Sequence, residues 1–301
     1  MPTLHYRMVD VFTDRPFAGN PLAVVLDADD LDTADLQKIA RQFNLSETAF
    51  PMVPAHDERL AGADYRLRIF TPLTELPFAG HPSIGAAWVL ASLGRIDPGT
   101  VRQACGAGLL PLQVSAGGGP VELTGGLPTI GRELEPAPVL QAASLPPGAR
   151  LDSPVARVAG SGIDFVYLQL ADDRDVVRAG PDIGAVRQLA AAWGAVGLDL
   201  FSWDAEARTA HCRVLTVHAA SGEDPATGSA ALGLGAYLVA NRLLPADGES
   251  GYTVRQGAEI GRPSRLECTV VASGGAAVEC RVSGSVVAVA TGEIRRPPVR
   301  R

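Results

Sequence analysis

The sequence predicts an α+β protein built from two similar halves. Its 301 residues reach the size at which a single hydrophobic core stops growing, so two domains are expected rather than one. Segments that alternate polar and apolar residues outnumber helical ones, and the two kinds do not alternate regularly, which argues against a βαβ protein. A motif of an acid, a proline, a glycine turn and an apolar helix occurs twice, which indicates two related units.

The strands and helices are predicted from their hydrophobic periods. Period-two alternation and a β-branched run predict strands at 4–12, 22–28, 64–71, 164–170, 212–219, 265–272 and 278–290. Helical spacing predicts helices at 31–44, 83–94, 182–194 and 229–244. The first helix is expected to begin at Asp32 or Thr33 and to end at Asn44, which tolerates the left-handed conformation of a helix end. Residues 115–120 predict a hairpin turn, and the proline-rich, aperiodic segment 131–152 predicts a crossover between domains.

Composition and charge exclude several classes of function. The net charge is −7 and no basic run occurs, which argues against binding to nucleic acid or to an anionic membrane surface. No apolar run suits a signal peptide or a membrane span, so a cytoplasmic protein is expected. No CxxC pair, histidine cluster or phosphate-binding glycine loop occurs, so we expect no metal and no cofactor. Free thiols are expected at Cys105, Cys212, Cys268 and Cys280.

One hexapeptide occurs twice in the sequence with a single substitution. PFAGNP at 16–21 returns as PFAGHP at 77–82, and the change is Asn20 to His81. Only the second copy leads into a predicted helix, and a helix N-terminus favours an anion. A packed histidine in a tight corner is the alternative interpretation of this segment.

A longer alignment pairs the second hexapeptide with the segment that begins at Pro225. His81 then falls on Ser229, and the shared positions are Pro77/Pro225, Gly80/Gly228, Gly85/Gly233 and Leu90/Leu238. If the two halves face each other, both helix ends would grip one small acidic substrate. Coincidence among common residues, and ordinary helix capping by Thr227 or Ser229, remain alternatives.

Two acids stand out beside these corners. Glu47, in NLSETAF, precedes an apolar run, and burial there would let it accept and return a proton near neutral pH. An exposed strand edge is the alternative for Glu47. Asp224, in GEDPATGSA, is either a site acid or a complement to the helix dipole. Its neighbour Glu223 is expected to be the solvated one of the pair.

These motifs together resemble one family. NLSET, PFAGHPSIGAA and GEDPATGSAA, with the opening VDVFTDRPFAGNPLAVVLDA, look like the PhzF phenazine-biosynthesis family. RIFTP, TGGLP, QGAEIGRPSRL and VATGEI add to the match, which runs from residue 9 to about residue 294. The resemblance implies a diaminopimelate-epimerase-like fold of two pseudo-symmetric domains, each a curved, mainly antiparallel sheet around a central helix. It implies domains at 1–128, completed by 286–301, and at 129–285, and a homodimer.

The resemblance also implies an activity without cofactor, the isomerisation of trans-2,3-dihydro-3-hydroxyanthranilate by a proton shift. Glu47 matches the acid that moves the proton from C3 to C1, Asp224 the carboxylate that holds the substrate amine, and His81 the imidazole that assists. Substrate-binding positions are matched by Asn20, Ser46, Gly80, Gly228 and Ser229. Three alternatives stay open: an epimerase or racemase on the same fold, an isomerase of another cyclic or unsaturated amino acid, and a non-catalytic metabolite-binding relative. The epimerase mechanism needs two thiols, whereas the matching positions hold His81 and Asp224.

Overall fold

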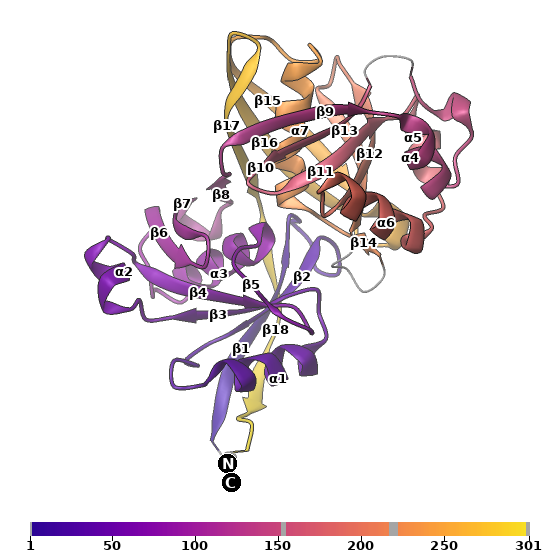
Figure 1. Ribbon diagram of the computed structural model, residues 1–301. Helices are drawn as coiled ribbons and strands as arrows, with labels where there is room; N and C mark the ends of the chain where they lie inside the picture. The colour runs from indigo at the N-terminus through magenta and orange to yellow at the C-terminus, as the bar shows by residue number, and fades with distance from the viewer. Residues whose placement is uncertain (1, 152–154, 217–221, 299–301) are drawn as a thin grey trace. The chain divides into compact units, whose positions relative to one another are not determined.

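The computed structural model describes residues 2–151, 155–216 and 222–298 (Figure 1). The chain divides into two compact units, residues 1–123 with 283–301 and residues 124–282. From the sequence we expected the divisions at 128 and 286. The segment predicted as a crossover, 131–152, lies inside the second unit, where its described part forms strand β9 and helix α4.

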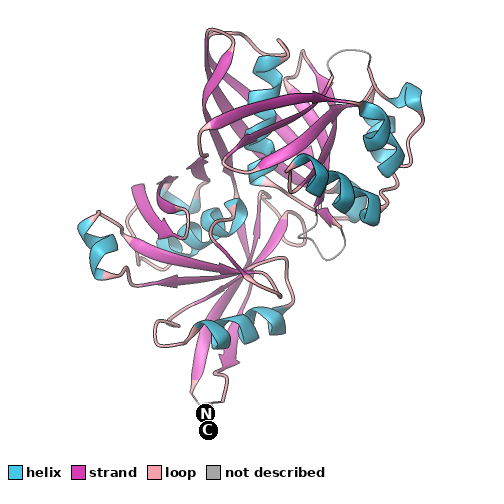
Figure 2. Ribbon diagram, in the orientation of Figure 1, coloured by secondary structure: helices cyan, strands magenta, loops and turns pink. Residues whose placement is uncertain are grey.

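The first unit is a mixed, mainly antiparallel sheet with helices on both faces (Figure 2). Its strands are β1 (Thr3–Val11), β2 (Asn20–Val25), β3 (Thr48–Met52), β4 (Tyr65–Phe70), β5 (Glu75–Leu76), β6 (Gly99–Cys105), β7 (Gly108–Val114), β8 (Val121–Thr124) and β18 (Val286–Arg295). Its helices are α1 (Thr33–Phe43), α2 (His56–Leu60), α3 (Gly80–Ser92) and the 3₁₀ turn η1 (Ala116–Gly118). β18 pairs with β1, so the C-terminal strand completes this unit.

The second unit has the same kind of sheet. Its strands are β9 (Pro128–Leu134), β10 (Ala156–Ser161), β11 (Asp164–Gln169), β12 (Gly197–Asp204), β13 (Thr209–Thr216), β14 (Glu223–Asp224), β15 (Gly248–Gln256), β16 (Ser264–Ser273) and β17 (Ala276–Gly284). Its helices are α4 (Pro136–Ala142), α5 (Asp173–Arg178), α6 (Ile183–Trp193) and α7 (Gly228–Ala240), with the 3₁₀ turns η2 (Pro147–Ala149) and η3 (Ala258–Ile260). Part of the predicted strand 212–219, with His218, lies outside the described residues.

The strand pairing of the second unit repeats that of the first, which confirms the predicted duplication. The order β1–β2 antiparallel, β2–β3 parallel, β3–β4 and β4–β5 antiparallel, β4–β6 parallel and β6–β7 antiparallel describes the first unit. The same order holds for β10, β11, β12, β13, β14, β15 and β16. In both units a long helix, α3 or α7, follows the two-residue strand. These registers therefore give residues of these strands in one unit an equivalent in the other.

The helices α3 and α7 are buried on nearly every side, which is typical of a helix enclosed by a sheet. Two glycines permit the close packing of these helices. A Cβ on Gly85 would lie 2.5 Å from Leu22 Cδ2, and one on Gly233 would lie 2.3 Å from Tyr167 Oη. The opposite face of each sheet is covered by other helices, α1 in the first unit and α4 to α6 in the second.

The predicted local signals agree with the structure in several places. Asp32 caps α1 through its side chain, and Asn44 ends that helix in the left-handed conformation at φ 52°. Residues 115–120 join the antiparallel strands β7 and β8. Helix α3 begins at Gly80 rather than at residue 83, so His81 lies in its first turn. Among the described residues, no helix is long and apolar enough to cross a bilayer.

Candidate active site

A neutral histidine lies in the first turn of α3. His81 is 6% exposed, because α3 is enclosed by the sheet of the first unit. Burial lowers the pKa of His81 to about 3, since a buried imidazolium loses most of its solvation by water. His81 is therefore a neutral imidazole at physiological pH, with one nitrogen that donates and one that accepts.

The amide of Asn20 determines which nitrogen of His81 carries the hydrogen. Asn20 is fully buried, and its Nδ2 lies 3.3 Å from His81 Nδ1. The Ser46 hydroxyl donates to Asn20 Oδ1 at 3.4 Å, which turns the amide nitrogen toward the imidazole. An amide N–H can only donate, so His81 Nδ1 accepts and the ring hydrogen is on Nε2.

The other side of this imidazole faces Glu47. Glu47 precedes β3 and is only 9% exposed, which excludes the exposed strand edge considered above. Its Oε2 lies 3.5 Å from His81 Nε2. This distance is longer than a strong hydrogen bond, as catalytic contacts often are before a substrate binds. The first unit thus gathers four sequence-predicted residues in one cluster: Asn20, Ser46, Glu47 and His81. Gly80 is beside them as the first residue of α3.

A second corner lies at the start of α7. Asp224 ends β14, and Gly228 and Ser229 are the first residues of α7. Asp224 and Ser229 are half-buried. Thr227 is at the N-cap but does not cap the helix with its side chain; its hydroxyl donates to Asp224 Oδ2 at 2.6 Å. Ordinary capping by Thr227 is therefore wrong as an interpretation of this motif.

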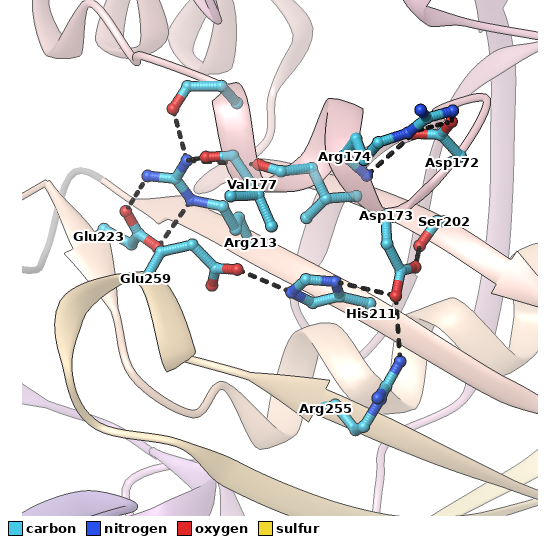
Figure 3. A network of polar contacts seen from close by, with 12 residues as sticks. Asp172, Asp173, Arg174, Val177, Ser202, His211, Arg213, Glu223, Arg255 and Glu259 are labelled. Carbon is cyan, nitrogen blue, oxygen red and sulfur yellow. Dashed lines mark hydrogen bonds and ion pairs between the residues drawn. The ribbon is translucent and has the colours of Figure 1, made fainter.

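The expectation that Glu223 would be the solvated acid is also wrong. Glu223 is buried and accepts two hydrogen bonds from Arg213, at 3.0 Å from Nε and 2.6 Å from Nη2. Arg213 also donates to backbone carbonyls at the end of α5, those of Val177 (Figure 3) and Ala179. Because neighbours on a strand face opposite sides, anchoring Glu223 to Arg213 turns Asp224 to the other side.

A further polar network surrounds this anchor. His211 Nε2 lies 2.8 Å from Glu259, and His211 Nδ1 lies 3.7 Å from Asp173, which Arg255 also contacts (Figure 3). This network connects β13, β15, η3 and α5. No group of three or more metal-ligating side chains occurs within the described ranges 2–151, 155–216 and 222–298.

The duplication places different chemistry on equivalent positions. Through the registers, Glu47 is equivalent to Gly197, and His81 to Ser229. A Cβ at residue 197 would lie 2.4 Å from the Leu215 carbonyl oxygen, so no acid fits there. The first unit therefore carries the only acid of this equivalent pair.

Three of the four cysteine thiols are buried, those of Cys212, Cys268 and Cys280. Burial raises the pKa of Cys212 and of Cys268, and raises that of Cys280 to about 12. A thiol held protonated is a poor nucleophile and a poor base, so these three do not suit a two-thiol epimerase mechanism. The fourth, Cys105, is half-buried and, like the others, is a free thiol.

Sequence reasoning missed Gln256, whose side chain bonds to Asp224 and Thr227. It is the first residue of the motif QGAEIGRPSRL, so the signal was present, but its partners lie about thirty residues earlier in the chain. Arg213 was missed for a related reason, since its partner Glu223 belongs to a strand of only two residues.

The chain was compared with known proteins. The family model for phenazine biosynthesis-like proteins matches residues 9–292. The trans-2,3-dihydro-3-hydroxyanthranilate isomerase of Pseudomonas aeruginosa is 32% identical over 290 residues, covering 95% of this chain and 98% of that protein. An uncharacterised isomerase of Mesorhizobium japonicum is 35% identical over 322 residues, covering 98% and 99%.

Solved structures agree with these relatives. A PhzF-family protein of Bacillus anthracis superposes with a TM-score of 0.87 at 25% identity, covering 98% of this chain and all of that one. A hydroxyproline epimerase of Agrobacterium vitis, at 15% identity and a TM-score of 0.64, shares the fold. The predicted fold class is confirmed, and the chain is an isomerase. It belongs to the phenazine biosynthesis-like (PhzC-PhzF) family.

Proposed function

We propose that this isomerase moves a proton between two carbons of a small unsaturated amino acid, trans-2,3-dihydro-3-hydroxyanthranilate or a related intermediate, with Glu47 as the acid and base. The observation that carries the proposal is the contact of Glu47 with His81. A carboxylate that is 9% exposed lies 3.5 Å from a neutral imidazole, among groups contributed by one unit.

The chemistry needs one mobile proton carrier. Glu47 takes the proton from the C3–H bond of the substrate, the electron pair spreads over the conjugated acid, and Glu47 returns the same proton to C1. No atom is gained or lost, so no co-reactant is needed and the reaction proceeds without a cofactor. His81 Nε2–H steadies the Glu47 carboxylate, or an oxygen of the substrate, as charge develops.

The second corner contributes groups that bind the substrate. Asp224 binds the substrate amine, while Ser229 and the backbone N–H groups at Gly80 and Gly228 bind the carboxylate at the two helix N-termini. The proposal includes the cytoplasmic homodimer that the family resemblance implies.

The asymmetry between the units supports a single base rather than two. The positions that match the two thiols of an epimerase hold His81 and Asp224 instead. The equivalent of Glu47 is Gly197, so the second unit has no counterpart of this acid. The curated relative in Pseudomonas aeruginosa, named as the dihydro-hydroxyanthranilate isomerase, favours the same chemistry. A different cyclic or unsaturated amino acid as substrate, or binding without turnover, is an outcome of the test below.

The test is incubation of the purified protein with trans-2,3-dihydro-3-hydroxyanthranilate in D₂O, followed by ¹H NMR. We expect the C3–H signal to disappear and the isomer with a new hydrogen at C1 to accumulate. Turnover of another cyclic amino acid in place of this one would assign the related substrate. Binding of such compounds with no change in any of them would contradict the proposal.

A further inference from the structure

We propose that Gln256 is a positioning residue that directs the hydroxyl hydrogen of Thr227 onto the Asp224 carboxylate and so presents Asp224 to the substrate amine. The inference rests on the proposed role of Asp224, but its test does not need turnover.

Gln256 uses both ends of its amide in the second corner. Its Oε1 accepts from the backbone N–H of Thr227 at 3.1 Å, and its Nε2 donates to the Asp224 carbonyl at 2.7 Å and to Thr227 Oγ1 at 3.0 Å. The residue is 2% exposed, so water does not replace these partners. The backbone N–H and C=O have fixed polarity, and together they allow the amide one orientation.

That orientation fixes the direction of the Thr227 hydroxyl. Because Gln256 Nε2 already donates to Oγ1, the hydroxyl accepts there and its own hydrogen is available for Asp224 Oδ2, 2.6 Å away. The contact is short, as expected for a hydroxyl that donates to a charged carboxylate. The bond from Thr227 thereby orients the Asp224 carboxylate. A donated hydrogen bond favours the charged form of a carboxylate, which is the form that binds an amine.

The first unit shows that the fold does not require this arrangement. The equivalents of Asp224, Thr227 and Gln256 are Leu76, Ala79 and Cys105, three side chains that cannot form these bonds. The surrounding frame is nevertheless the same in both units. Arg68 donates twice to Glu75, as Arg213 does to Glu223, and Gly106 packs on Pro77 as Gly257 does on Pro225. The triad of Asp224, Thr227 and Gln256 is thus not needed for the fold, because the first unit forms the same backbone arrangement without it.

The test is a ¹³C NMR titration of the Asp224 carboxyl in the full-length protein, with no substrate present. In Thr227→Val the carboxylate loses its hydroxyl donor, and in Gln256→Met that hydroxyl is no longer directed onto it. In both variants we therefore expect the carboxyl to titrate at higher pH than in the wild type. Thr227→Ser keeps the hydroxyl and should restore the wild-type midpoint. The double variant should shift no more than the larger single shift, because both changes break one chain of hydrogen bonds.

Gln103→Met is the matched control, since Gln103 is also a buried glutamine, bonded to Tyr65 and Ser83 in the first unit. It should lower the Tm and leave the Asp224 titration unchanged. If Gln256→Met does not fold, Thr227→Val tests the same hydrogen bond with a substitution that nearly conserves the volume of the side chain. An unchanged Asp224 midpoint in Thr227→Val, or in a folded Gln256→Met, would overturn the inference.

Turnover adds an independent measurement. Gln256→Met should raise KM for an amine-bearing substrate roughly tenfold with kcat nearly unchanged, which corresponds to one hydrogen bond. A shifted titration in a protein without isomerase activity would contradict the proposed function and leave the positioning role intact. A normal titration in an active enzyme would do the reverse.

Discussion

Asn20 and His81 are the one pair by which two otherwise identical hexapeptides differ, and their side chains contact each other: Asn20 Nδ2 lies 3.3 Å from His81 Nδ1. The repeated corner therefore serves as a frame, and the changed position is where the chemistry lies. The amide supplies a donor on one side of the imidazole, and the imidazole presents its own N–H toward Glu47 on the other.

The tautomer of His81 can be tested directly. Asn20→Asp replaces the donor at His81 Nδ1 by an acceptor, so the ring hydrogen should move to Nδ1 or the ring should become protonated. ¹⁵N NMR of the histidine ring distinguishes these states from the Nε2–H form expected for the wild type. His211, in the second unit, is an internal control whose signals should not change. An Nδ1–H tautomer in the wild type would contradict the hydrogen-bond direction assigned between Asn20 and His81.

Acid should destabilise the protein through His81. The imidazole has a pKa of about 3 in the folded state, against an ordinary pKa of 6.5 for histidine, so the unfolded state binds more protons between these pH values. The free energy of unfolding should fall as the pH is lowered from 6.5 toward 3, with a contribution of at most about 1.4 kcal/mol per pH unit. His81→Gln should flatten this slope in urea titrations, while His5→Gln, at an exposed histidine, should not. Equal slopes in wild type and His81→Gln would refute it.

Asp199, a buried acid of the second unit, should make the protein less stable as the pH rises, which is opposite to the effect of His81. Burial raises the pKa of Asp199 to about 7, although the contact with Cys212 opposes this. The folded state then holds the proton between pH 3.8 and 7, so this group's contribution to stability falls as the pH rises through that window. At pH 8, Asp199→Asn should be more stable than the wild type by about 1 kcal/mol or more, measured by urea unfolding. Asp97→Asn, at an exposed acid, is the control. An Asp199→Asn variant that is less stable than the wild type at pH 8 would be inconsistent with this explanation.

The enclosed helix of the second unit should not tolerate a methyl group at Gly233. A Cβ there would lie 2.3 Å from Tyr167 Oη, whose hydroxyl donates to the Ala230 carbonyl in the first turn of α7. Gly233→Ala should therefore lower the free energy of unfolding by about 1–3 kcal/mol, even though alanine favours helices. Gly148→Ala, where a Cβ meets nothing within 4 Å, should be near neutral in the same thermal or urea assay. Similar stabilities for both variants would argue against the packing described here.

The duplication and the two corners could be predicted because they depend on local signals. Proline, glycine and an apolar helix recur at fixed offsets near Pro77 and Pro225, and the structure gives both segments the same strand pairing. The capping of α1 by Asp32 was readable for the same reason, since the cap and its partner are three residues apart.

What could not be predicted depends on partners distant in the chain or on very short elements. Glu223 was expected in solvent because no residue near it in the sequence indicates a partner. Its partner Arg213 lies on β13, the strand that pairs with β14. Helices α2, α4 and α5 have five to seven residues, too few to show a helical period. The role of Gln256 appears only when β15 lies beside β13.

The central claim is that Glu47 carries the proton, and the turnover number of Glu47→Gln tests it most directly. The amide has nearly the same shape but cannot take a proton from carbon, so with trans-2,3-dihydro-3-hydroxyanthranilate we expect kcat to fall by about 10²–10⁴-fold or more. The wild-type Tm should be retained within a few degrees, and Glu206→Gln, at an exposed acid, should keep full activity. A Glu47→Gln enzyme with kcat close to that of the wild type would contradict the account.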